Sequence, residues 1–161
     1  MPTERGFTLI EILVVLVIIG ITLGFALIAF GDFGASRQAI VTAEQFSSYV
    51  KLVQQRAILE ANTLGINIGK DGYETYRFEQ ATSWQSMPKK GMFHWHPFPQ
   101  NIVVNLESRI ENNGKGPDII INPSGDMSEF TLTFGTTTKP NIIHVVGKHN
   151  GHLLIQDDKS S

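Results

Sequence analysis

A single carboxylate lies inside the long apolar segment near the start of this chain. From Phe7 to Phe30 there are 24 residues, and Glu11 is the only one with an ionisable side chain. A carboxylate within a membrane-spanning helix raises the free energy of membrane insertion by about 2.5 to 3.5 kcal/mol on insertion scales. A helix that served only as an anchor would have no use for such a residue. The sequence therefore predicts that Glu11 pairs with a positively charged group.

Five histidines are the candidate metal ligands of the chain. His94 and His96 form a His-x-His pair, and the others are His144, His149 and His152. On a strand, the paired histidines would point to the same side, whereas a zinc site needs three or four ligands that converge in space. Because Pro97 and Pro99 indicate a rigid loop next to the pair, we expect no metal site.

Carboxylates in two turns, Asp71 to Glu74 and Asp126, could offer oxygen ligands to calcium. Neither segment approaches the ligand density of an EF-hand loop, and both are better explained as turns. The chain has no Gly-x-Ser-x-Gly elbow, phosphate-binding loop or metalloprotease helix motif. Glu107 and Glu111 are spaced like a solvated face. We therefore expect no enzymatic activity and no cofactor.

The charge balance argues against partners that need a charged surface. Residues 36–161 carry 12 acidic and 12 basic side chains, so their net charge is zero, and nothing there would attract nucleic acid. Lys89 and Lys90 lie near Trp84, Phe93 and Trp95, which leaves a base-stacking platform as a weaker alternative. The absence of cysteine excludes disulfides and thiol catalysis.

The segment from Phe7 to Phe30 predicts a helix long enough to cross a membrane. At about 1.5 Å rise per residue it would reach about 36 Å, compared with a hydrocarbon core of about 30 Å. A secretory signal peptide has a shorter apolar stretch of roughly 7 to 15 residues, and a plain anchor would not explain Glu11. Gly31 and Gly34 then predict a kink or a locally melted turn.

A second helical pattern runs from about Ser36 to Ala61. Its apolar residues recur at alternating spacings of four and three, which defines one face of an amphipathic helix. These residues are Ala39, Ala43, Phe46, Val50, Val53 and Ala57. We expect this face to pack on a sheet of the same domain, with contacts to neighbouring subunits as the alternative.

From Leu64 onward the pattern changes to short strands and turns. Strands are expected at residues 64–68, 73–80, 84–87, 102–106, 118–122, 129–134, 142–146 and 152–156. The first two are typical of a hairpin, Asn150-Gly151 predicts another, and Pro123 to Asp126 is typical of a tight turn. The expected fold class is α+β, with one long helix laid against antiparallel strands.

The residues Gly6-Phe7-Thr8-Leu9-Ile10-Glu11 resemble the processing site of type IV pilins and type II secretion pseudopilins. The resemblance implies that residues 1–6 are a leader peptide, that a prepilin peptidase cuts between Gly6 and Phe7, and that Phe7 is N-methylated. It also implies that residues 7–30 form the transmembrane and filament-core helix and that residues 31–161 form a periplasmic domain of pilin-like fold. In such filaments Glu11 would meet the N-terminal amine of a neighbouring subunit. The leader holds only Arg5 as a base, offset by Glu4, so the positive-inside cue is weak.

Two further segments, residues 55–73 and 119–134, resemble the H-type minor pseudopilins of type II secretion. The resemblance implies a structural subunit near the tip of a pseudopilus, single-pass in the bacterial inner membrane, that helps folded proteins across the outer membrane. Its implied partners are other major and minor pseudopilins, the prepilin peptidase, the inner-membrane assembly platform and, as a further candidate, secreted cargo.

Two alternative functions remain open from the sequence. The first is a minor type IV pilin or competence pseudopilin that serves pilus assembly or DNA uptake. The second is a tip adhesin or cargo receptor that uses the loop from Trp84 to Gln100. In that case Met87, Met92, Phe93 and Trp95 would form an exposed partner patch. Burial of the same four side chains inside the domain is the alternative.

Overall fold

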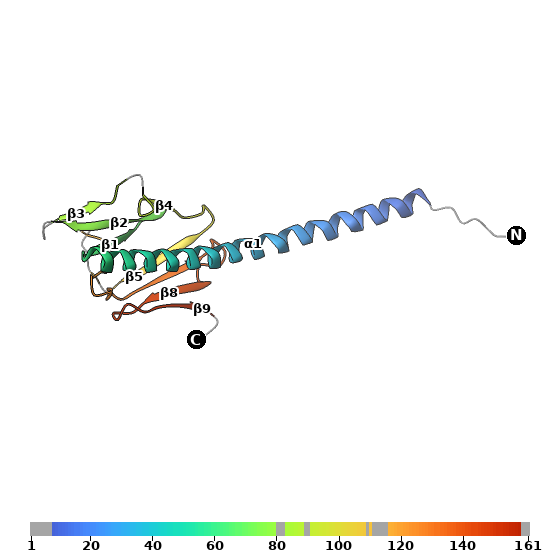
Figure 1. The fold of residues 1–161 in the computed structure, drawn as a ribbon. Helices are drawn as coiled ribbons and strands as arrows, with labels where there is room; N and C mark the ends of the chain where they lie inside the picture. Colours follow the sequence, from blue (N-terminus) through green and yellow to red (C-terminus); the bar gives the residue numbers. More distant parts are fainter. Residues whose placement is uncertain (1–7, 80–82, 89–90, 109, 111–115, 159–161) are drawn as a thin grey trace. The chain divides into compact units, whose positions relative to one another are not determined.

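The computed structural model describes residues 8–79, 83–88, 91–108, 110 and 116–158, and residues 27–33 by their backbone only. In this part of the chain, one helix, α1 (Leu9–Glu60), precedes all of the strands (Figure 1). The chain divides into two compact units, Met1–Gly34 and Ala35–Ser161. The first unit holds the apolar part of α1, and the second holds the amphipathic part with the strands.

The strands of the second unit form two antiparallel sheets, which confirms the predicted α+β class. The first sheet has the order β3-β2-β1-β6, and β4 also pairs with β2. It consists of β1 (Leu64–Ile68), β2 (Gly72–Glu79), β3 (Ser83–Ser86), β4 (His96–Pro97) and β6 (Ile119–Ile121). The second sheet has the order β5-β7-β8-β9. It consists of β5 (Val103–Ser108), β7 (Phe130–Gly135), β8 (Ile143–Gly147) and β9 (Leu153–Asp157).

The predicted apolar face of α1 is confirmed, because all six of its residues are fully buried in the core of the second unit. The helix ends where it was expected. Ala61 has a positive φ of 49°, its N–H donates to Ile58 O (3.3 Å), and Asn62 N–H donates to Ala57 O (3.1 Å). This pair of hydrogen bonds is the Schellman arrangement that satisfies the last carbonyls of a helix.

The prediction of a melted turn at residues 31–34 was wrong, because α1 runs without interruption from Leu9 to Glu60. A glycine in a helix costs only about 1 kcal/mol relative to alanine. Two glycines separated by two residues therefore do not outweigh the hydrogen bonds of a helix that continues for several turns on each side.

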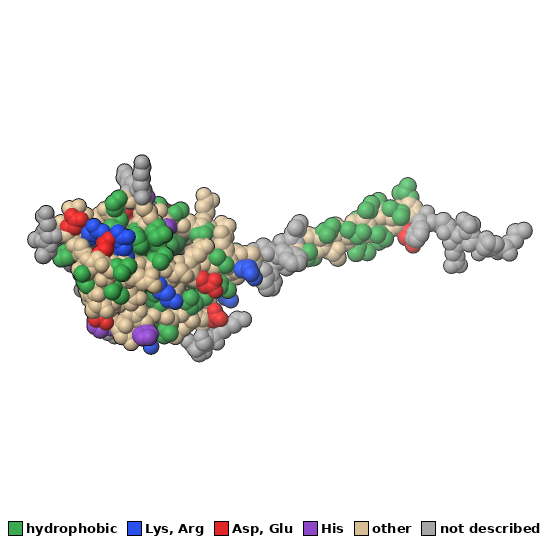
Figure 2. Space-filling view, viewed as in Figure 1, with side chains coloured by type: hydrophobic (Ala, Val, Ile, Leu, Met, Phe, Trp, Pro, Cys, Tyr) green, Lys and Arg blue, Asp and Glu red, His purple; other side chains and the backbone are tan. Residues whose placement is uncertain are grey.

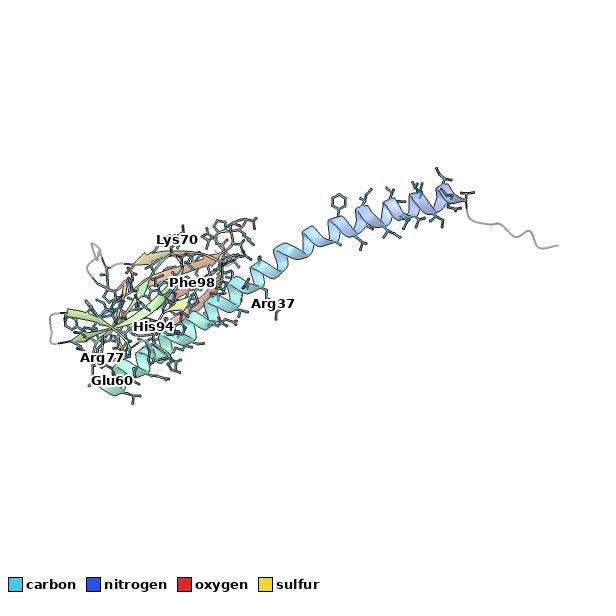
Figure 3. The ribbon with its side chains drawn as sticks, turned by 90° about the horizontal axis from the view of Figure 1, so that it is seen from above. Arg37, Glu60, Lys70, Arg77, His94 and Phe98 are labelled. Carbon is cyan, nitrogen blue, oxygen red and sulfur yellow. The ribbon has the colours of Figure 1, made fainter. Side chains whose placement is uncertain are left out.

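Phe46 lies at the centre of the core and joins α1 to both sheets. Its ring centroid is 5.1 Å from that of Tyr73 in β2, 6.3 Å from Phe130 and 5.9 Å from Phe134, both in β7. Phe98 adds a second link between the sheets, because its ring contacts both Tyr73 and Phe134. Figure 3 draws the side chains of the helix and the strands and labels Phe98.

All eight predicted strands are present, with each end within two residues of the prediction. Both predicted hairpins, β1–β2 and β8–β9, are confirmed. The short strand β4 was missed, because Pro97 and Pro99 favoured a loop. Proline is tolerated at the edge of a sheet, and here His96 and Pro97 pair with the start of β2. Gly72 makes this approach possible, since a Cβ there would lie 2.3 Å from His96 O.

The tight turn predicted at Pro123 to Asp126 is confirmed, and a helix side chain holds it in place. Gly125 N–H donates to Asn122 O (2.9 Å), and Gly125 has a φ of 89°. Gln54 of α1 donates from Nε2 to Gly125 O (2.6 Å) and to Gly151 O (3.1 Å). One amide group thus ties the turn that follows β6 to the turn of the β8–β9 hairpin.

We predict that none of the three tyrosines ionises at its ordinary pH while the domain is folded. Burial raises the pKa of Tyr49 and of Tyr73 to about 12, and the hydrogen bond from Tyr76 to Glu74 (2.6 Å) raises the pKa of Tyr76 to about 12. Because the unfolded pKa is about 10, the stability from these phenols is complete below pH 10 and is lost as the pH rises towards 12. Tyrosinate absorbance of the full chain in detergent should therefore rise together with unfolding. Ionisation of the tyrosines near pH 10 while the domain stays folded would contradict this prediction.

Candidate assembly site

Glu11 lies in the first turn of α1 and is exposed. The first hydrogen bonds of the helix are made to the backbone carbonyl of Thr8. This carbonyl accepts hydrogen bonds from the N–H of Glu11 (3.1 Å) and from the N–H of Ile12 (3.3 Å). A carboxylate in the first turn is favoured by the helix dipole by roughly 0.3 to 1 kcal/mol. Gly6 and Phe7, the residues predicted to carry the processing, lie outside the described residues.

The helix around Glu11 is apolar and unburied. The segment Leu9–Ala26 is long and apolar enough to cross a membrane, and none of it is buried. Figure 2 shows these hydrophobic side chains along the first unit. The hydroxyl of Thr22 donates to the carbonyls of Ile18 (3.0 Å) and Ile19 (2.9 Å), so this polar group is satisfied within its own helix, as a lipid environment requires.

The apolar part of the helix supplies no counter-charge for Glu11. No lysine, arginine or histidine occurs between Phe7 and Gly34, and the next base is Arg37, which belongs to the second unit. The dipole offsets only part of a desolvation cost of about 2.5 to 3.5 kcal/mol. The segment from Phe7 to Gly34 therefore contains no basic side chain that could pair with Glu11.

The structure does not bring the five histidines together. His96 stacks on Tyr73, with ring centroids 5.3 Å apart, and its Nε2 lies 2.8 Å from Met92 O. His144 is on β8 in the other sheet, where Nδ1 pairs with Thr133 Oγ1 (2.8 Å). In the described part of the chain, no three histidine, aspartate or glutamate side chains are grouped as a metal site requires.

Two of the carboxylates considered as calcium ligands accept hydrogen bonds from neighbouring side chains. Glu74 Oε1 accepts a hydrogen bond from Tyr76 (2.6 Å), and Asp126 Oδ2 accepts one from Ser124 (2.9 Å). Asp71 accepts through its backbone carbonyl from Phe98 N–H (2.8 Å). Of the two glutamates spaced like a solvated face, Glu107 is exposed and Glu111 lies outside the described residues.

For the four candidate patch residues in the loop from Trp84 to Gln100, the sequence left exposure and burial open, and the structure divides them. Met87 and Phe93 are buried, whereas Met92 and Trp95 are exposed. Phe93 is held by Tyr49, whose hydroxyl donates to Phe93 O (3.3 Å) and also pairs with Thr75 Oγ1 (2.6 Å). Lys89 and Lys90, the bases of the stacking platform, lie outside the described residues.

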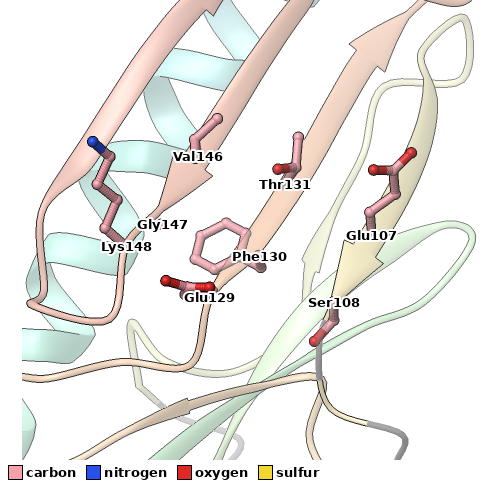
Figure 4. A pocket seen from close by; sticks show the side chains of 8 residues that line it. All are labelled: Glu107, Ser108, Glu129, Phe130, Thr131, Val146, Gly147 and Lys148. Carbon is pink, nitrogen blue, oxygen red and sulfur yellow. The ribbon is translucent and has the colours of Figure 1, made fainter.

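An open groove of about 610 Å³ lies at one end of the second sheet (Figure 4). Its lining combines two glutamates, one lysine, two hydroxyls and the edge of an aromatic ring, namely Glu107, Ser108, Glu129, Phe130, Thr131, Val146, Gly147 and Lys148. This lining contains no histidine and no cysteine.

Comparison with known proteins finds relatives for the N-terminal segment and for most of the chain. The prokaryotic N-terminal methylation motif matches residues 1–27, which include Gly6, Phe7 and Glu11. Type II secretion system protein H of Pseudomonas aeruginosa is 28% identical over 143 residues, covering 82% of this chain and 83% of that protein. Type II secretion system protein H of Klebsiella pneumoniae is 28% identical over 150 residues, with 82% and 86% covered.

Solved structures show the same fold for the greater part of the chain. The minor pseudopilin EpsH of Vibrio cholerae superposes with a TM-score of 0.65 at 20% identity, covering 77% of this chain and 99% of that one. The solution structure of Escherichia coli GspH gives a TM-score of 0.65 at 15% identity, with 79% and 93% covered. In its N-terminal motif, in its sequence over most of its length and in its fold, the chain is thus similar to the H-type minor pseudopilins of type II secretion.

Proposed function

We propose that this chain is a structural minor subunit of a type II secretion pseudopilus, placed near its tip, and that it aids the export of folded proteins across the outer membrane. The observation that carries this proposal is Glu11, a lone carboxylate on an apolar, unburied helix segment that contains no base. Such a charge has a role where a neighbouring subunit supplies a positive charge that pairs with it. The relatives named type II secretion system protein H support the same role.

Three segments of the chain have separate roles in this proposal. Residues 1–6 are a leader that a prepilin peptidase removes by cutting between Gly6 and Phe7, and Phe7 is then N-methylated. Residues 7–30 are the membrane-spanning and filament-core helix, and residues 31–161 are the periplasmic domain. The match of the N-terminal methylation motif to residues 1–27 supports this division.

The helix serves two environments in turn. In the inner membrane it anchors the chain by a single span. In the filament the same apolar residues pack against the helices of other pseudopilins, and Glu11 pairs with the amine of a neighbouring Phe7. Removing one member of a desolvated ion pair costs about 3 to 5 kcal/mol because the other charge is left alone. Glu11 thus fixes the axial register of one subunit against the next.

The globular domain presents surfaces to its neighbours and performs no chemistry of its own. Its partners in the proposal are the other pseudopilins, the inner-membrane assembly platform and secreted cargo. The alternative role, in a type IV pilus or in DNA uptake, would need a basic surface. Residues 36–161 have no net charge, and the relatives from Pseudomonas aeruginosa and Klebsiella pneumoniae are named for secretion.

Deletion of the gene in its own bacterium tests the proposal. We expect folded secreted enzymes to accumulate in the periplasm, and we expect the full-length wild-type chain to restore export and to appear in filaments sheared from cells that overproduce the pseudopilus. A strain that lacks the chain but exports normally, and loses DNA uptake or pilus formation instead, would favour the alternative.

A further inference from the structure

The turn between β8 and β9 contains a dipeptide, Asn150-Gly151, with a chemical reactivity that the proposed function does not use. Asparagine is one of the thermolabile residues of proteins. The backbone nitrogen of the residue that follows an asparagine can attack its side-chain amide carbon and close a five-membered succinimide ring. Glycine leaves this approach open because it has no side chain. Asn150 is exposed, so water reaches its side chain.

The backbone of this connection is a type I turn followed by a glycine bulge. Gly151 N–H donates to Lys148 O (2.9 Å), and Lys148 N–H donates to His152 O (2.9 Å). Gly151 has a φ of 80°, and the one non-glycine residue with a positive φ in the described part of the chain lies outside this turn. Because Asn150 lacks a positive φ, a type II turn is excluded. A type I turn that ends in a left-handed glycine is a common hairpin connection.

The hydrogen bonds of the closed turn oppose the ring closure. The Gly151 nitrogen must lose its proton and turn toward Cγ of Asn150. In the closed turn its N–H is hydrogen-bonded to Lys148 O (2.9 Å). The Asn150 side chain is engaged as well, because its Oδ1 accepts from His152 N–H (3.2 Å). The attacking nitrogen and the side chain under attack are therefore both held until the turn opens.

Contacts from outside the hairpin keep the turn closed. Gln54 of α1 donates from Nε2 to Gly151 O (3.1 Å) and to Gly125 O (2.6 Å). Met127 N–H donates to His149 O (3.1 Å). The packing is close, since a Cβ on Gly151 would lie 2.4 Å from Gly125 O. Of these contacts, the two from Gln54 can be removed by one side-chain substitution that leaves the sequence of both turns unchanged.

We propose that Asn150 is a site of spontaneous deamidation, that opening of the β8–β9 turn controls the reaction, and that Gln54 keeps the turn closed. Parts of a fold open locally with free energies below that of global unfolding. In the open turn the Gly151 nitrogen bonds to Asn150 Cγ. Its proton passes through water to the side-chain nitrogen, which leaves as ammonia. Water then adds to one of the two ring carbonyls, the C–N bond to that carbonyl breaks, and the product is aspartate or isoaspartate.

The isoaspartate product makes the opening of the turn permanent. Its main chain runs through the former side chain and is one carbon longer on the way to Gly151. The close packing of Gly151 on Gly125 O leaves no room for this extra length. The Gly151 carbonyl is therefore displaced from Gln54, and the tie between the two turns is lost.

The rate of deamidation in the folded and the unfolded chain tests the control by the turn. The full chain is incubated in detergent, with and without guanidinium chloride, and the peptide that follows Lys148 is analysed by mass spectrometry. Asn113-Gly114 has the same dipeptide and serves as the reference in the unfolded chain. We expect Asn150 to react at least tenfold more slowly in the folded chain than in the unfolded chain. Equal rates would overturn the inference.

Substitutions of Gln54 test its part in the control. Gln54→Ala removes both hydrogen bonds, and Gln54→Glu removes the donor while it keeps the length of the side chain. We expect both variants to deamidate about tenfold faster than wild type while folded, because a lost hydrogen bond favours local opening. Gln55→Ala changes an exposed neighbour on the same helix and should react within twofold of wild type. Near-ultraviolet circular dichroism verifies that each variant is folded.

Ile66→Val separates local opening from global unfolding. Ile66 is fully buried in β1 of the first sheet, so this variant lowers the melting temperature without changing the turn. Its rate at Asn150 should stay within twofold of wild type. The inference would be overturned if Ile66→Val accelerated the reaction as much as the Gln54 variants, or if both Gln54 variants reacted at the wild-type rate. None of these measurements involves a filament, so their outcome is independent of the proposed function.

Discussion

Glu11→Ala is expected to leave the chain in the membrane and to exclude it from the pseudopilus. Loss of the carboxylate removes an insertion cost of about 2.5 to 3.5 kcal/mol, so anchoring should be unchanged or stronger. In the filament the same change leaves a neighbouring amine without its partner, at a cost of about 3 kcal/mol or more. Since 1.4 kcal/mol corresponds to about tenfold, we expect incorporation to fall roughly 100-fold.

The measurement is the ratio of membrane-bound chain to chain in sheared filaments, with two variants as controls. Glu11→Asp keeps the charge on a shorter side chain and should incorporate better than Glu11→Ala. Val15→Ala changes the same helix one turn further on and should incorporate nearly as wild type does. Equal incorporation of Glu11→Ala and wild type would show that the carboxylate has no pairing role.

Phe46→Ala is expected to destabilise the globular domain severely. The ring is fully buried and contacts rings in both sheets, so its removal leaves a cavity between the helix and the two sheets. Truncation of a buried phenylalanine costs about 3 to 5 kcal/mol. Because a domain of this size has a total stability of about 5 to 15 kcal/mol, the melting temperature should fall by roughly 10 to 20 °C.

Thermal unfolding of the full chain in detergent, followed by near-ultraviolet circular dichroism, measures this change. Leu52→Ala, on the exposed side of the same helix, should shift the melting temperature by no more than a few degrees. Comparable shifts for the two variants would mean that Phe46 is not the residue that joins the helix to both sheets.

The helix faces and hairpins could be predicted from the sequence because their signals are local. The buried face of α1 follows from a spacing of four and three residues, and the β8–β9 hairpin follows from Asn150-Gly151. Glu11 stands out by its position relative to Gly6 and by the apolar run around it. Each of these patterns lies within one helix or one turn, so no knowledge of distant contacts was needed.

Features that depend on distant contacts could not be predicted. β6 and β7 are separated by a tight turn that is typical of a hairpin, yet they belong to different sheets. Glu60 illustrates the difference. Its ion pair with Arg56 lies within one helix turn and is of a predictable kind, whereas its second pair, with Arg77 of β2 (2.5 Å), depends on where the strand passes.

Whether Phe93 and Met87 are buried or exposed could not be decided from the sequence for the same reason. Their segment has the prolines, glycines and lysines of an exposed loop, and Phe93 is enclosed by two residues of α1. These are Tyr49 and Arg56, whose guanidinium carbon lies 5.8 Å from the centre of the Phe93 ring. Gln54 is a comparable case, because its role depends on two glycine carbonyls that are 71 and 97 positions further along the chain. No signal within the helix itself distinguishes Gln54 from the exposed Gln55.

The proposed ion pair requires that the mature chain begin with a free amine at Phe7, able to meet the Glu11 of another subunit. Mass spectrometry of the N-terminal peptide from the native protein tests this requirement directly. We expect a peptide that starts at Phe7, lacks the first six residues and carries one methyl group on its amine. A native protein that retains Met1 to Gly6 would contradict the pairing, because the positive charge proposed to meet Glu11 would then lie six residues away.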